Sequence, residues 1–465
     1  MGLRYFPSIP TSVPPDMTMS IRRAALVALF GAAVSATMSV PAAAQRGSKS
    51  AGKAAAQPKT PPTREAARAH AVEILTASPL VDGHNDLPWA IREQKGMERD
   101  VDAYDLRRKT PHQTDLARIR SGHLGGQFWS VYIPGDIKDS GFARVQLEQI
   151  DIARRAIAKY PEAFVAAGTA ADMRTAFKNH KVGSMLGIEG GHAIENSLGA
   201  LRAYYDLGVR YMTLTHNVTL DWADAANDAP KHGGLTNFGK EVVREMNRLG
   251  MMVDLSHVSP AVMSNALDVS EAPVMFSHSS ARAIVDHPRN VPDSILQRLP
   301  KNGGVVMVNF YPGFDSPSLR ARELERGRQV AALRQRLGAD SGAISRETTA
   351  WDAAHPAPRA TLAEVANMID HIKQTAGADH VGIGSDFDGV DDELPIGLED
   401  LSNYPDLFAE LIVRGWNDTD LKKLAGENIL RALEKAEQVA RKLQRERPAS
   451  TKTIEELDGK PKPKM

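Results

Sequence analysis

Short apolar segments alternate with longer amphipathic segments along most of this chain, and this alternation restricts the fold more than any other feature. The apolar segments are rich in β-branched residues and have the length of buried strands, whereas 145–159, 238–249 and 362–376 between them have helical periodicity. We expect strands at 80–82, 127–133, 184–189, 210–215, 251–256, 274–277, 304–309 and 381–385. Strands separated by helices pair in parallel through right-handed crossovers.

Eight such units in about 370 residues predict a single α/β domain, a (β/α)8 barrel of the TIM type. A doubly wound open sheet is the alternative, but no Gly-x-Gly-x-x-Gly follows the first strand, which argues against its dinucleotide-binding form. Residues 316–359 interrupt the alternation between the seventh and eighth strands. Because this segment is rich in Arg and Ala, we expect an inserted, solvated helical excursion, with one helix over 320–337, rather than a binding lid.

The two ends of the chain differ in composition from its centre. Arg22 and Arg23 precede a small, apolar stretch, and 41–44 resembles a cleavage site, so we predict a signal peptide over 1–44, with Met17 or Met19 as the true start. An uncleaved anchor is the alternative. We expect a disordered linker over 45–63, the barrel domain over 64–444 and a disordered tail over 445–465.

Charge and cysteine content exclude several classes of function. The chain has 57 basic and 57 acidic side chains, a balance that argues against a nucleic-acid-binding protein. It has no cysteine, which excludes disulfides, thiolate zinc sites, iron–sulfur clusters and cysteine nucleophiles. Any metal ion must therefore be held by His, Asp and Glu.

Side chains that can bind metal ions stand at or just after the ends of six of the eight predicted strands. The carboxyl ends of barrel strands form one face, where the loops build the active site. His84 and Asp86 point to the same side if the chain there is extended, because residues i and i+2 share a face. The other strand-end residues are Glu189, His216, His257, His278 and Asp386.

The residue types match a binuclear hydrolytic metal centre. Such a centre needs a carboxylate bridge, neutral imidazole ligands and a water molecule that the metals acidify. We expect Glu189 to bridge, His84 and Asp86 to hold one metal, and His257 and His278 to hold the other.

Two further strand-end residues suit catalysis. Asp386 can take the proton of the water molecule and pass it to the leaving amine. His216, if it is not a ligand, can polarise the scissile carbonyl. The alternative for His216 is a histidine at the edge of the core, bonded to Asp221 or Asn217.

Seven motifs, in this order along the chain, resemble those of the membrane dipeptidase (renal dipeptidase) family. The resemblance extends from about Ala67 to Lys442. The motifs are Asp82-Gly83-His84-Asn85-Asp86, Gly187-Ile188-Glu189-Gly190, Leu214-Thr215-His216-Asn217, Asp254-Leu255-Ser256-His257, Ser277-His278-Ser279-Ser280, Arg289-Asn290-Val291-Pro292-Asp293 and Gly384-Ser385-Asp386-Phe387-Asp388-Gly389.

The resemblance implies a (β/α)8 barrel that holds two Zn²⁺ per chain and hydrolyses dipeptides with a hydroxide between the metals. It implies the same metal ligands as above, His84, Asp86, Glu189, His257 and His278. It further implies that His216 contacts the substrate carbonyl, Arg289 binds the substrate's terminal carboxylate and Asp386 shuttles the proton. Spacing does not single out Arg289, whose alternative role is an ion pair with Asp286 or Asp293.

Members of the family on animal cells carry a lipid anchor and disulfides, whereas this chain has no cysteine and no apolar C-terminal tail. It resembles a secreted bacterial-type member. We therefore expect a periplasmic protein with dipeptide substrates, no nucleic-acid partner and no stable membrane anchor after signal cleavage, and the resemblance leans towards a homodimer.

Three other functions remain open. A related metal-dependent amidohydrolase would act on a cyclic amide, lactone or ester and would not require a free carboxylate in its substrate. A sugar-phosphate enzyme is disfavoured because the acidic loop at 386–388 repels phosphate. A barrel that only binds ligands would lack a metal ligand, and none is missing from the sequence.

Overall fold

The structure, a computed structural model, describes residues 61–137, 141–390 and 394–459. The predicted signal peptide and nearly all of the predicted linker lie outside the described residues. Within those described ranges, no helix has both the length and the apolar character that crossing a lipid bilayer requires.

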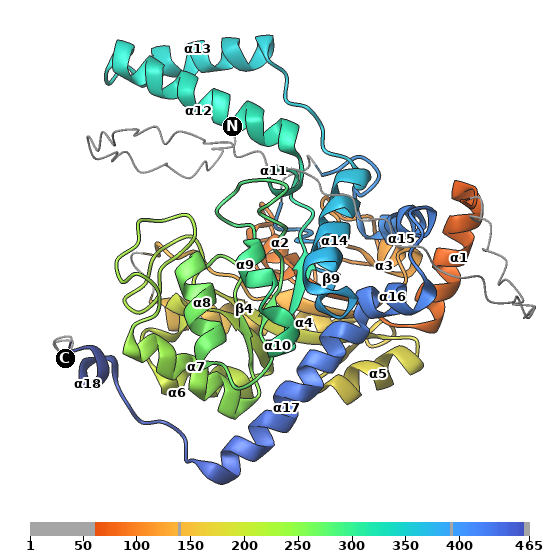
Figure 1. The fold of residues 1–465 in the computed structure, drawn as a ribbon, viewed down its shortest axis with the longest axis vertical. Coiled ribbons are helices and arrows are strands. Elements are labelled where there is room, and N and C mark those ends of the chain that lie inside the picture. Colours follow the sequence, from red (N-terminus) through yellow and green to blue (C-terminus); the bar gives the residue numbers. More distant parts are fainter. Residues whose placement is uncertain (1–60, 138–140, 391–393, 460–465) are drawn as a thin grey trace, which may run out of the picture. The chain divides into compact units, whose positions relative to one another are not determined.

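Eight parallel strands close into a barrel, and helices surround it (Figure 1). Around the barrel, β1 lies between β2 and β9, and the order continues β8, β7, β6, β5 and β4. Pairing of β4 with β2 closes the ring, which confirms the (β/α)8 fold and rules out the open sheet. The strands are β1 (Leu80–Asn85), β2 (Leu124–Ser130), β4 (Val182–Glu189), β5 (Val209–Thr213), β6 (Met252–Asp254), β7 (Met275–Phe276), β8 (Val305–Val308) and β9 (Val381–Ile383).

A ninth strand, β3 (Phe164–Ala166), was not predicted from the sequence. It pairs only with the beginning of β4, where Phe164 lies opposite Val182. Of its three residues only Phe164 is buried, so the segment lacks the apolar run that marks the barrel strands.

The predicted helices are present, and α7 (Asn237–Leu249) shows why they form. Its buried side chains include Phe238, Val242 and Met246, which are four residues apart and face the core. Gly250 ends the helix in the left-handed conformation, at φ 87°. Also predicted were α4 (Phe142–Lys159) and α14 (Leu362–Ala376), and a further helix, α1 (Arg64–Ala77), precedes the first strand. The remaining helices of the barrel domain are α2 (Leu87–Glu93), α3 (Leu116–Ser121), α5 (Ala170–Lys178), α6 (Leu198–Asp206), α8 (Pro260–Val269), α9 (Asp293–Leu296), α10 (Leu299–Asn302), α11 (Pro312–Asp315), α15 (Tyr404–Val413), α16 (Asp418–Lys422) and α17 (Asn428–Glu446).

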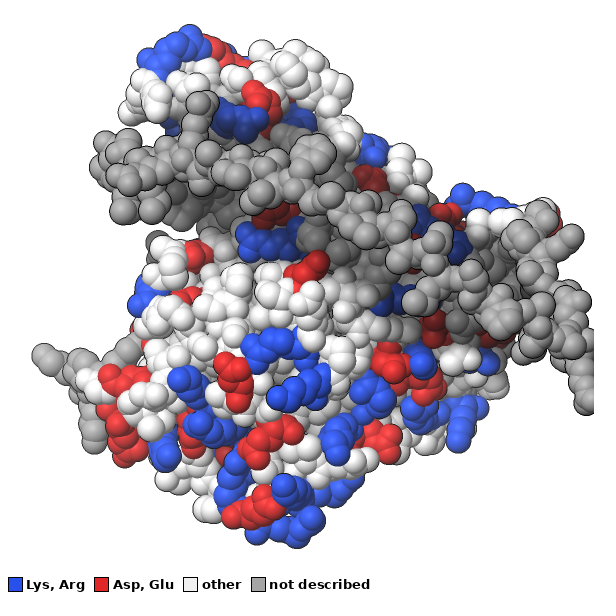
Figure 2. Space-filling view, viewed as in Figure 1, with Lys and Arg blue, Asp and Glu red and all other residues white. Residues whose placement is uncertain are grey.

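The insertion between β8 and β9 is a pair of helices, α12 (Pro317–Leu337) and α13 (Ser341–Ala354), that extend side by side away from the barrel (Figure 1). Leu333 is the only buried residue of α12, and α13 has none. Arg322 and Arg326 hold the two helices together through Asp352, at 2.7 and 2.9 Å. The expectation of a solvated helical excursion is confirmed. On the face shown in Figure 2, basic and acidic side chains are intermixed.

The prediction of a disordered tail from residue 445 is wrong for the described residues up to 459. After α17, the chain returns to the barrel and forms a short helix, α18 (Ile454–Asp458). The Asp458 carboxylate caps the beginning of α7, accepting from Asn237 N at 3.0 Å, and the side chain of Ile454 is buried. Ile454, Asp458 and the hydrogen bonds of Ser450 to Glu241 and Glu245 anchor a segment whose composition is otherwise typical of disorder.

The barrel interior beneath the strand ends is filled by large side chains, among them Met185, Tyr211 and Met307, which are fully buried. Tyr211 crosses the interior against Gly187, where a Cβ atom would lie 2.0 Å from the tyrosine ring. Glycine at position 187 therefore allows the Tyr211 hydroxyl to reach the carboxyl end of β1.

Candidate metal centre and active site

The carboxyl ends of the strands bring together all of the predicted metal ligands. Three groups each have donor atoms within 4.8 Å of one another, and Glu189 belongs to two of them. The groups are His84, Glu189 and His278; Glu189, His216 and His257; and His84, Asp86 and Asp386. The structure therefore also places His216 and Asp386, which were predicted to act in catalysis, beside the ligands.

Glu189, the last residue of β4, lies at the centre of this cluster. Its Oε1 atom is 3.0 Å from His257 Nε2 and 3.4 Å from His278 Nε2. It is also 3.6 Å from His216 Nε2, while the Oε2 atom is 3.6 Å from His84 Nε2. One buried carboxylate thus faces four imidazoles, the position that a bridging ligand requires.

His84 and Asp86 form the other side of the cluster. His84 Nε2 lies 3.1 Å from Asp86 Oδ2 and 3.7 Å from Asp386 Oδ1. The second oxygen of Asp86 is buried and has no hydrogen-bond partner among the described residues. A buried acceptor without a donor is costly unless a cation binds it.

The second ring nitrogen of each histidine predicted to be a metal ligand is held by a hydrogen-bonding group. His84 Nδ1 is 2.7 Å from the Tyr211 hydroxyl, and His257 Nδ1 is 3.2 Å from Asn217 Oδ1. His278 Nδ1 is 2.8 Å from Ser277 Oγ. When Nδ1 carries the proton and donates it to these groups, the lone pair of Nε2 faces the cluster, as metal-binding histidines require.

The electrostatics of the cluster fit a divalent cation. Burial, together with the neighbouring charge of Asp86, raises the pKa of Glu189 to about 8 and the pKa of Asp386 to about 6, although His84 and Arg289 oppose the rise. Burial lowers the pKa values of His257 and His278 well below 6.5, so both imidazoles are neutral. The neutral imidazoles of His257 and His278 and the clustered carboxylates are a donor set for zinc and similar ions, whereas the carboxylates outweigh burial and raise the pKa of His84 to about 10, so this imidazole must release a proton to bind a metal ion.

Two residues of the site adopt left-handed backbone conformations that are costly for residues other than glycine. These are His257, at φ 65°, and Asp386, at φ 66°. Asn309, directly after β8, donates from Nδ2 to Asp386 Oδ2 at 3.0 Å and accepts from the backbone N–H of Tyr311. Asn309 thus orients the Asp386 carboxylate. Sequence reasoning placed Asn309 at the end of a strand but gave it no role.

Arg289 is buried beside the cluster. Its guanidinium donates to Ser279 Oγ at 3.3 Å and to the backbone oxygen of His278 at 3.1 Å. The Nε–H group has no hydrogen-bond partner, and no carboxylate in the described ranges lies within ion-pair distance of Arg289.

The ion pairs that were the alternative for Arg289 are not formed. Asp286 pairs with Arg282 at 2.8 Å, and Asp293 pairs with His371 at 2.8 Å. A buried guanidinium with donors to spare is suited to a carboxylate supplied by a ligand.

His216 faces the cluster rather than the edge of the core. Its ring contacts those of His257 and Tyr132, with centroids 4.3 and 4.9 Å apart. Asn217, one of its alternative partners, is hydrogen-bonded to His257 instead. Burial lowers the pKa of His216 well below 6.5, so its imidazole is neutral.

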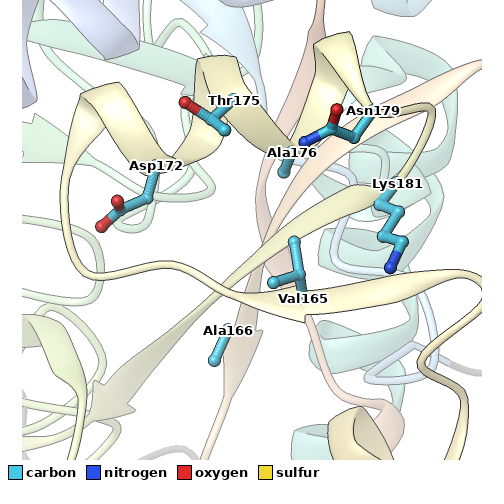
Figure 3. A pocket seen from close by; sticks show the side chains of 7 residues that line it. All are labelled: Val165, Ala166, Asp172, Thr175, Ala176, Asn179 and Lys181. Carbon is cyan, nitrogen blue, oxygen red and sulfur yellow. The ribbon is translucent and has the colours of Figure 1, made fainter.

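A surface cavity, shown in Figure 3, is remote from this site. It is lined by residues of β3 and α5, including Val165 and Asp172, together with Lys181. Val165 pairs with Gly183 near the beginning of β4, whereas Glu189 ends that strand. The cavity therefore lies towards the amino ends of the strands, away from the cluster.

Comparison with known proteins identifies the family. The family model for membrane dipeptidases, peptidase family M19, matches residues 68–447. An uncharacterized dipeptidase of Schizosaccharomyces pombe is 43% identical over 378 residues, which cover 77% of this chain and 81% of that protein. Dipeptidase 3 of Mus musculus is 40% identical over 390 residues, which cover 83% of this chain and 70% of that protein.

A solved structure agrees with this assignment. The probable dipeptidase PvdM from Pseudomonas aeruginosa has a TM-score of 0.70 and 26% sequence identity, over 81% of this chain and 100% of that chain. The chain belongs to the membrane dipeptidase family, peptidase family M19, and is a metallo-dipeptidase that hydrolyses peptide bonds.

Proposed function

We propose that the enzyme binds two zinc ions per chain and uses them to hydrolyse dipeptides. The observation that carries this proposal is the position of Glu189, whose two oxygens face imidazoles on both sides of the cluster. His84 and Asp86 would hold one ion, and His257 and His278 the other, with Glu189 shared between them. When bound, the ions would supply an activated water molecule and a Lewis acid for the peptide carbonyl.

Asp386 and His216 would provide the proton transfers and orientation around the scissile bond. Asp386, oriented by Asn309, would accept the proton of the attacking water and return it to the departing amine. The neutral His216 imidazole would donate a hydrogen bond to the carbonyl oxygen as negative charge develops there.

Arg289 would select substrates with a free carboxylate one residue from the scissile bond. Its buried guanidinium has unused donors and no carboxylate partner among the described residues. An enzyme that acts on a cyclic amide, lactone or ester would not need this group, so the unpaired Arg289 favours the dipeptidase over the related amidohydrolase.

Metal content and substrate range, measured on one sample, test the proposal. We expect close to two zinc ions per chain by elemental analysis and hydrolysis of unblocked dipeptides, with little hydrolysis of the same dipeptides as C-terminal amides. A protein with fewer than two tightly bound zinc ions would refute the binuclear assignment. Equal hydrolysis of free and amidated dipeptides would refute the role of Arg289.

We also propose that the mature enzyme begins near Gln45, is exported to the periplasm and forms a homodimer. These proposals rest on the signal-like composition of residues 22–44 and on the family resemblance. Cell fractionation with N-terminal sequencing would test the first two. Light scattering on the purified protein would test the third.

A further inference from the structure

Asp254, the last residue of β6, is a buried carboxylate that the proposed reaction does not use. Its side chain is fully inaccessible, and within the described part of the chain no cationic group lies within ion-pair distance of it. Four donors satisfy it instead. Oδ1 accepts from the backbone N–H groups of Ser256 and Ser277, at 3.1 and 2.8 Å. Oδ2 accepts from the hydroxyls of Thr213 and Ser277, at 2.5 and 2.6 Å.

Ser277 connects this carboxylate to a metal ligand. Its Oγ atom is 2.6 Å from Asp254 Oδ2, 2.8 Å from His278 Nδ1 and 3.5 Å from Ser256 Oγ. The hydroxyl has a single proton, and the charged acceptor at the shortest distance takes it. The serine oxygen is then an acceptor towards His278, so the Nδ1 atom of His278 must carry a proton and donate it.

We propose that Asp254 is a positioning residue that sets the tautomer of His278 through the hydroxyl of Ser277. The carboxylate fixes the direction of the serine proton, the serine fixes the proton on Nδ1, and the lone pair of His278 Nε2 is thereby directed at Glu189. Loss of the group that accepts a hydrogen bond from the non-ligating nitrogen of a metal-binding histidine typically lowers metal affinity by about 10–100-fold. The inference rests on the proposed function, because it assigns His278 as a zinc ligand.

Asp254→Asn tests whether the carboxylate sets the direction of the Ser277 hydroxyl proton, because it removes the charge without changing the shape of the side chain. The two backbone N–H groups of Ser256 and Ser277 hold the amide oxygen at the Oδ1 position. The NH₂ group then faces the Ser277 hydroxyl and donates to it, so the serine proton turns towards His278. Nδ1 becomes an acceptor, and the imidazole proton moves to Nε2, where it blocks the metal site.

Asp82 provides a matched control because it makes the same pattern of contacts on the other side of the barrel. It is fully buried, and its Oδ1 accepts from the backbone N–H groups of His84 and Ser385, both at 3.0 Å. Its Oδ2 accepts from the hydroxyls of Ser385 and Tyr404. Among the described contacts, neither hydroxyl reaches an imidazole nitrogen. Asp82→Asn therefore measures the effect of replacing such a carboxylate without the link to a histidine.

The experiment is a zinc titration of each metal-stripped variant against a chromophoric chelator, with thermal unfolding of the metal-free proteins measured in parallel. We expect Asp254→Asn to weaken one of the two zinc sites by about 10–100-fold, while Asp82→Asn binds both ions as the wild type does. Ser277→Ala should weaken zinc binding at the same single site, because His278 Nδ1 loses its acceptor. This variant replaces Asp254→Asn in the titration if Asp254→Asn does not fold.

The outcomes separate this inference from the proposed function. Wild-type zinc affinity in Asp254→Asn or in Ser277→Ala would overturn the role of Asp254, and so would an equal loss of affinity in Asp82→Asn. A wild-type protein that binds no zinc would instead overturn the proposed binuclear site.

Discussion

Replacing Arg289 by methionine should remove the preference for a free carboxylate while leaving the chemistry intact. An arginine has five N–H donors, and Arg289 uses two of them for Ser279 Oγ and the His278 backbone oxygen. The remaining donors are enough for a bidentate carboxylate. Charge-assisted hydrogen bonds contribute about 1.5–3 kcal/mol each, so two of them amount to about 3–6 kcal/mol.

Because about 1.4 kcal/mol corresponds to a factor of ten, kcat/KM for a free dipeptide should fall by about 10²–10⁴. The same dipeptide as its C-terminal amide lacks the carboxylate, so its slower hydrolysis should change much less. The measurement is kcat/KM for both substrates in both proteins. Arg282→Met is the control, because Arg282 pairs with Asp286 at 2.8 Å and has no contact with the cluster in the described structure. Equal losses on the two substrates would refute the assignment.

Three further changes test other parts of the structure. Glu189→Gln should lower zinc binding and reduce kcat at least 10²-fold, without unfolding the protein, whereas near-normal turnover would remove Glu189 from the mechanism. Burial lowers the folded pKa of His287 to about 3, so below 6.5 the unfolded chain takes up a proton that the folded chain does not. Between pH 7 and 5 this proton uptake lowers the free energy of unfolding by about 2 kcal/mol. In urea unfolding, the free energy of unfolding of His287→Asn should therefore fall by about 2 kcal/mol less over this pH range than that of the wild type. The same pH dependence in both proteins would contradict this prediction. Asp458→Ala should lower the free energy of unfolding by about 1 kcal/mol, as the loss of a helix cap does. An unchanged melting temperature would show that the tail does not stabilise α7.

The sequence predicted the barrel strands because each is a short apolar run between helical segments. The apolar pattern does not predict β3, because two of its three residues are exposed. The polar composition of the tail predicted disorder. Its order depends on a contact of Asp458 with the beginning of α7, more than 200 residues earlier in the chain, which composition does not reveal. In both cases the segment is ordered by a contact with another element, β4 for β3 and α7 for the tail, and not by a periodic apolar pattern of its own.

The sequence by itself determined which residues meet at the site. His84, Glu189, His257 and His278 each stand at a strand end, and a closed parallel barrel places all such ends on one face. Only the tertiary structure decided how these side chains are oriented. The hydrogen bonds from Asn309 to Asp386 and from Ser277 to Asp254 cross between neighbouring strands. They depend on register and side-chain direction, which the pattern of apolar runs does not encode.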